Sequence, residues 1–62
     1  MNKPRCKLIG EDGNIFNLLA ISRRALQRAG MNEEADKMFN EVTKSHSYYE
    51  ALAIISEYVE VE

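Results

Sequence analysis

Residues 7–16 read KLIGEDGNIF, and within this stretch a short strand gives way to a helix. Basic and apolar residues alternate over positions 5–8, a period of two that is typical of a half-buried strand. The GEDGN segment that follows supplies the glycines of a turn, and either Asp12 or Asn14 can accept hydrogen bonds from the free amides of a helix. We therefore expect a strand over about residues 4–9, followed by a helix.

Downstream of this turn, apolar residues recur with the period of an amphipathic helix in three segments, at about residues 15–29, 33–44 and 48–58. Gly30 is suited to end the first helix, Asn32 to cap the second, and Ser47 to cap the third. The expected apolar faces consist of Ile15, Leu18, Leu19, Ser22, Ala25, Leu26 and Ala29; of Ala35, Met38, Phe39 and Val42; and of Tyr48, Ala51, Leu52, Ile55, Tyr58 and Val59.

The last four residues, 59–62, alternate between valine and glutamate. A continued helix would place Glu62 on the apolar face, so we expect a short strand here, with a frayed helix as the alternative. Its natural partner is the strand near the N-terminus, where Arg5 and Lys7 would face the glutamates. The predicted fold class is therefore α+β and mainly α: one small domain over residues 1–62, with three helices and two short terminal strands.

Composition narrows the classes of function. The chain has 62 residues, with one cysteine and one histidine, so it cannot form an internal disulfide or a structural zinc site of its own. No apolar run reaches the length of a membrane span, and the N-terminus lacks the pattern of a signal peptide. We expect a reduced, cytoplasmic protein without membrane association, metal, cofactor or small-molecule substrate. So short a chain has little room for a deep catalytic cleft, and we expect no enzyme activity.

Two local patterns have a chemical and a structural interpretation. The acidic residues of the GEDGN turn could bind a cation, but their spacing lacks the ligand pattern of a calcium loop, and helix capping explains them. Cys6 lies between two basic residues, which lower the pKa of a thiol, and His46 could pair with it as a base. Because Cys6 shares its strand face with Leu8, we expect a buried, inert thiol.

Charge is divided unequally between the two halves of the chain. Residues 1–30 carry six basic and two acidic side chains, whereas residues 31–62 carry two basic and eight acidic ones. If the basic residues converge, they form a surface that can contact phosphates, and nucleic-acid binding is the alternative function that we consider. The candidate nucleic-acid contacts are Lys3, Arg5, Lys7, Arg23, Arg24 and Arg28.

The favoured function is that of a non-catalytic protein-interaction module, with self-association as one form of it. Small domains complete their cores through partners, and the edges of a two-stranded sheet can pair with another chain. Phe16 lies at the margin of the first helix's apolar face and Tyr49 lies off the third helix's apolar face, so we expect both aromatic rings to be exposed protein contacts. Tyr48 and Tyr58 are expected to belong to the core.

The sequence also resembles a family of very short bacterial and mobile-element proteins with no assigned function. The resemblance rests on the segments KLIGEDGNIF at 7–16, RALQRAG at 24–30 and SYYEAL at 47–52. It covers most of residues 7–61, and the last segment fits either with one residue inserted or with Tyr49 as the matching tyrosine. The resemblance implies the strand–turn–helix order and a bacterial origin, and it implies no activity, cofactor or partner.

Overall fold

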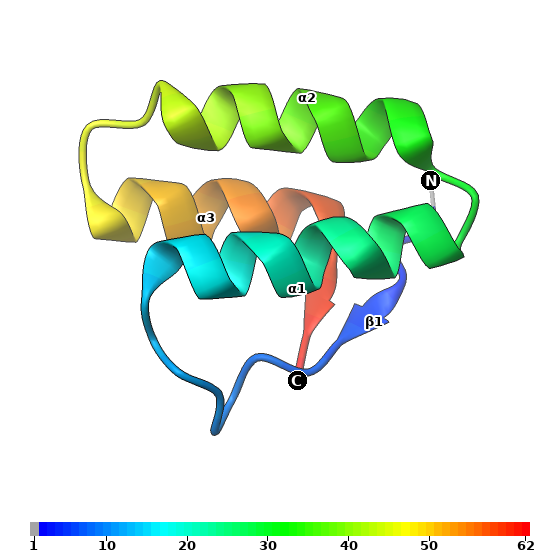
Figure 1. Ribbon diagram of the computed structural model, residues 1–62, viewed down its shortest axis with the longest axis horizontal. Helices are drawn as coiled ribbons and strands as arrows, with labels where there is room; N and C mark the ends of the chain where they lie inside the picture. Colours follow the sequence, from blue (N-terminus) through cyan, green and yellow to red (C-terminus); the bar gives the residue numbers. More distant parts are fainter. Residues whose placement is uncertain (1) are drawn as a thin grey trace.

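A computed structural model describes residues 2–62 and confirms an α+β fold that is mainly helical (Figure 1). The order of the described elements is β1 (Arg5–Cys6), α1 (Ile15–Arg28), α2 (Asn32–Thr43), α3 (Tyr48–Tyr58) and β2 (Glu60–Val61). All three helices contact one another, β1 packs against α1, and β2 follows directly from α3. In Figure 1 the strands lie on the side of α1 and α3 that faces away from α2.

The first and last strands form a two-stranded parallel sheet, which confirms the expected pairing of the two ends of the chain. Arg5 is in register with Glu60, and Cys6 with Val61. The three helices run alternately in opposite directions, so the chain leaves α3 at the end of the molecule where β1 begins (Figure 1). Because an odd number of helical passes separates the strands, β2 runs in the same direction as β1.

Both strands are shorter than the sequence predicts. The amides of Leu8 and Ile9 both donate to the Glu62 carbonyl, at 2.8 and 3.1 Å, so the ladder ends there. The amide of Glu11 then donates to the Leu8 carbonyl at 3.1 Å and begins the turn, where Gly10 takes a positive φ of 91°. The turn therefore shortens the strand expected over residues 4–9 to Arg5–Cys6.

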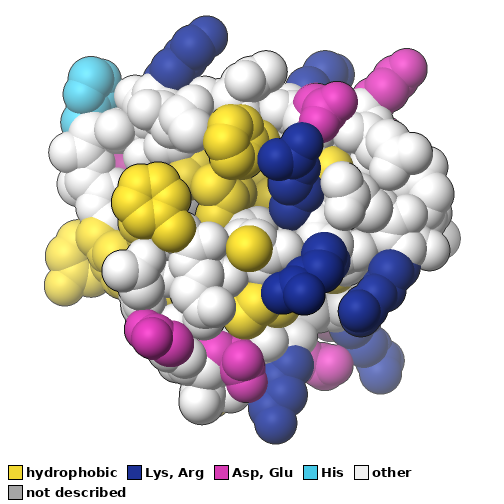
Figure 2. Space-filling view, viewed as in Figure 1, with side chains coloured by type: hydrophobic (Ala, Val, Ile, Leu, Met, Phe, Trp, Pro, Cys, Tyr) yellow, Lys and Arg dark blue, Asp and Glu magenta, His cyan; other side chains and the backbone are white. Residues whose placement is uncertain are grey.

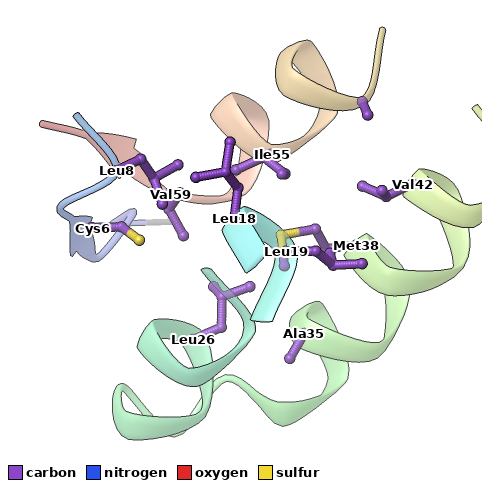
Figure 3. Packing of buried hydrophobic residues seen from close by; sticks show 11 residues of the cluster. Cys6, Leu8, Leu18, Leu19, Leu26, Ala35, Met38, Val42, Ile55 and Val59 are labelled. Atoms are coloured by element: carbon purple, nitrogen blue, oxygen red, sulfur yellow. The ribbon is translucent and has the colours of Figure 1, made fainter. Parts of the chain in front are cut away.

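The core lies where the three helices and the strands meet (Figure 3). Its buried apolar residues are Cys6, Leu8, Leu18, Leu19, Leu26, Ala35, Met38, Val42, Ala51, Ile55 and Val59. Ser22, on the same face of α1, is fully buried, and its hydroxyl donates to the Leu18 carbonyl at 2.7 Å. The apolar periodicity of each helix thus locates the centre of the core correctly.

Two aromatic residues assigned to the apolar faces lie at the surface instead. Phe39 is 38% exposed because Met38 and Val42 occupy the central positions of the α2 stripe. Tyr48 is 43% exposed because its ring reaches over the turn before α1, where its hydroxyl donates to the Gly13 carbonyl at 2.5 Å. Tyr58 is half-buried and packs against the edge of the core.

The helix caps agree with the sequence at α1 and α3 and differ at α2. The side chain of Asn14 accepts from the Phe16 amide at 2.9 Å, while Asp12 accepts from the Asn14 amide at 3.0 Å, so both candidate residues organise this turn. Ser47 caps α3. Asn32 is wrong as a cap, because it is already the first residue of α2, and the preceding residue makes no side-chain cap bond.

Candidate functional site

Phe16 is 73% exposed and lines two hollows on one face of the molecule. The first hollow lies between the start of α1 and the α2–α3 connection, where Val42, Tyr48 and Ala51 provide apolar walls. The second lies between α1 and α2 and is lined by Phe16, Leu19, Ala20, Arg23, Arg24, Gln27 and Phe39. We call this second hollow the α1–α2 groove. Figure 2 shows hydrophobic side chains gathered over this part of α1 and the adjacent edge of α2.

Helical geometry explains why Phe16 cannot enter the core. Leu18, Leu19 and Ser22 define the buried side of α1. Phe16 and Ala20 lie one turn apart on a neighbouring stripe that continues to Arg24, since residues four apart share a face. The exposed stripe therefore carries a large apolar ring, then a methyl group, then a cation.

Arg23 of α1 and Phe39 of α2 both line the groove and contact each other. The Arg23 guanidinium carbon lies 4.9 Å from the centre of the Phe39 ring, a distance suited to a cation–π contact. The same guanidinium donates to Asp36 at 3.2 Å, and the side chains of this ion pair are 38% and 67% exposed. These contacts hold the Phe39 ring across the groove from α1.

The six basic residues proposed as nucleic-acid contacts do not act as one free set. Arg23 is already engaged by Asp36 and Phe39, and the Lys3 ammonium donates to the Ser56 carbonyl in the last turn of α3 at 2.9 Å. The remaining four side chains, Arg5, Lys7, Arg24 and Arg28, are exposed. Figure 2 shows Lys and Arg side chains over the C-terminal half of α1 and toward the strands, interrupted by acidic side chains.

Tyr49, the second aromatic candidate, is 82% exposed on α3. Its ring packs edge-to-face on Tyr48 with the two ring centres 6.1 Å apart. Tyr48 lines the first hollow, whereas Tyr49 lines none of the hollows described. The exposure expected of both candidates is present, but Phe16 alone faces the α1–α2 groove, and the binding role of each stays a prediction.

The reactive groups considered from the sequence lie in separate places. Cys6 is 4% exposed, its thiol donates weakly to the Ser22 hydroxyl at 3.9 Å, and burial raises the pKa of this thiol more than that bond lowers it. His46 is exposed in the α2–α3 connection, beside the first hollow. The Asp12 carboxylate accepts from the amide of Asn14, the cap residue of α1, and so organises the turn. These placements agree with the structural interpretation of each group.

Within residues 2–62, His, Cys, Asp and Glu side chains form no group of three or more that could hold a metal ion. None of the helices in that range has both the length and the apolar composition needed to span a lipid bilayer.

Comparison with protein-family models, curated proteins and solved structures gives no match for this chain. The resemblance to short bacterial and mobile-element proteins therefore stays a prediction.

The sequence did not indicate Ala20, Gln27 and Phe39 as parts of the site. The i, i+4 spacing of Phe16, Ala20 and Arg24 was a usable signal for the α1 side, but the position of Phe39 depends on how the two helices pack.

Proposed function

We propose that this protein is a non-catalytic interaction module that binds a protein partner through the face around Phe16. The observation that carries the proposal is a largely exposed phenylalanine side chain between two hollows that share Phe16 and Leu19 in their linings. An aromatic ring beside concave apolar walls, with an arginine at the rim, is the composition found at the centres of protein interfaces.

The experiment compares two exposed apolar side chains. Ile9 is 71% exposed, close to the value for Phe16, and lines a different hollow beside the strands. Immobilised parent, Phe16→Ser and Ile9→Ser proteins are incubated with a nuclease-treated bacterial lysate, a source suggested by the resemblance, and with the purified protein itself. We expect partners that are retained by the parent and by Ile9→Ser to be lost with Phe16→Ser, at low and at moderate salt alike.

Neither substitution removes a buried side chain, so we expect both variants to fold like the parent. Circular dichroism of each variant checks this. If both variants lose the retained proteins, the binding is non-specific and depends on exposed apolar surface in general. Retention by Phe16→Ser would remove this face from the proposal.

Nucleic-acid binding is the second candidate, favoured by the exposure of Arg24 and Arg28 on α1. Affinity for a labelled oligonucleotide should then fall steeply with salt, and the double change Arg24→Gln/Arg28→Gln should reduce the slope by about 0.9 for each phosphate contact removed. Lys37→Gln/Lys44→Gln, on the acidic half of the chain, is the matched control and should leave the slope unchanged. Equal slopes for the two double variants would argue against this surface.

A further inference from the structure

The exposed stripe of α1 is complementary to itself. Toward the N-terminal end of the helix lie the acidic turn residues Glu11 and Asp12, and toward the C-terminal end lie Arg24 and Arg28. The projecting Phe16 ring lies about one helical turn before Ala20, and the α1–α2 groove, which both residues line, extends past Ala20 to Arg24 and Gln27. When one helix carries both a projecting ring and a groove, two copies related by a twofold axis can each place the ring in the groove of the other.

We infer that two copies of this chain pack α1 against α1 in antiparallel fashion, with a twofold axis passing beside Ala20. This inference rests on the proposed function and names the partner of the Phe16 face. Helix residues equally far from Ala20 on either side then meet across the axis, so Phe16 of one copy lies beside Arg24 of the second. The acidic turn before α1 in turn approaches the basic C-terminal end of the second copy's α1.

The small side chain at the axis permits this arrangement. Ala20 is exposed, and a methyl group lets two helices approach closely. Each Phe16 ring then enters the α1–α2 groove of the other copy, against the Phe39 ring and the Arg23 guanidinium that line it. The ring is buried, and its face meets the cations of the second copy.

The distribution of charge along α1 favours a second copy of this chain over a partner whose surface charge is all negative or all positive. The α1–α2 groove is rimmed by arginines, whereas the turn at the opposite end of the same helix is acidic, so a uniformly acidic ligand would gain at one end and lose at the other. In the antiparallel pair, opposite charges meet at both ends, and the two helix dipoles also oppose each other.

The position of α1 places the Phe16 stripe on one of the larger faces of the molecule. The molecule measures 27 × 25 × 16 Å along its principal axes, and Figure 2 looks down the shortest axis, so α1 lies across one of the two broad faces. A stable interface buries about 800 Å² per partner, roughly a fifth of the 4238 Å² surface of the chain.

The test uses sedimentation equilibrium of the parent, Ala20→Arg and the matched control Ala53→Arg. Ala53 is an exposed alanine on α3, and arginine is a good helix former, so both variants should keep the fold. We expect a dimer for the parent and for Ala53→Arg, and a monomer for Ala20→Arg. Phe16→Ala should raise the dissociation constant at least tenfold. Rising salt should weaken the dimer without abolishing it.

A cross-link tests the orientation. Because residues beside a twofold axis face their own copies, Ala20→Cys should form an intermolecular disulfide under mild oxidation, whereas the parent, with its buried Cys6, and Ala53→Cys should not. A parent that stays monomeric up to millimolar concentration overturns the inference, as does a dimer that survives Ala20→Arg or lacks the cross-link. A monomer that still binds another protein through Phe16 overturns only the second copy and leaves the proposed function standing.

Discussion

At the scale of single residues, Gly30 adopts a left-handed backbone conformation just after α1, where the sequence predicts the end of a helix. Its φ is +76°, and an added Cβ would meet nothing within 4 Å, so strain is the whole cost of a side chain there. We expect Gly30→Ala to lower the free energy of unfolding by about 1–2 kcal/mol, measured by urea denaturation. Gly13→Ala is the control, since Gly13 has no positive φ and its Cβ would make an ordinary contact with Tyr48. Equal losses in the two variants would contradict the assignment to backbone strain.

Also at this scale, the phenol of Tyr58 donates to the Glu41 carboxylate and thereby joins α3 to α2. This bond, with a smaller contribution from burial, raises the pKa of Tyr58 to about 12. Because the folded protein holds this proton more tightly than the unfolded chain does, the bond's contribution to stability is complete below about pH 10 and is lost as pH rises toward 12. Ultraviolet titration of phenolate should show one late step that is missing in Tyr58→Phe. A late step that persists in that variant would belong to another tyrosine.

At the scale of elements, α3 depends on its N-cap. The Ser47 side chain accepts from the Glu50 amide at 3.0 Å, so Ser47→Ala should destabilise the protein by about 1 kcal/mol in thermal or urea unfolding. Ser56→Ala, within the same helix, is the comparison. The Ser56 hydroxyl only donates back to the Leu52 carbonyl, so alanine should be neutral or slightly stabilising there. A larger loss at Ser56 than at Ser47 would show that the cap is not what stabilises this helix.

The comparison of predicted with observed elements shows which features depend on local sequence and which depend on how helices pack. Periodicity located all three helices and the buried positions such as Leu26 and Ile55, because those positions depend on local spacing. It failed for Phe39 and Tyr48, whose exposure depends on which neighbour occupies the centre of a helix contact. The expected cap at Asn32, which was based on its residue type, is wrong because α2 begins one residue earlier than expected, directly after the turn at Gly30. Of the site, Phe16 was predictable and the groove beside it was not, since a groove belongs to two helices.

At the scale of the whole molecule, stability rests on few buried side chains. A chain of this length has a stability of roughly 3–9 kcal/mol, and Ile55→Ala should remove about 2–5 kcal/mol of it, because Ile55 is fully buried. We expect that variant to be largely unfolded or to melt at a much lower temperature. Ile9→Ala, at an exposed position, should change the free energy of unfolding by less than about 0.5 kcal/mol. A stable Ile55→Ala protein would mean that the core tolerates the cavity.

The parallel pairing of β1 with β2 also sets an order of events during synthesis. Arg5 is synthesised before the three helices of residues 2–62, whereas Glu60, its neighbour in the sheet, is synthesised after them. The α1–α2 hairpin joins segments that are close in the sequence, whereas β1 has no strand to pair with until β2 is available. Until β2 is made, β1 can pack only against α1, so the backbone edge of β1 stays unpaired and open to pairing with another chain.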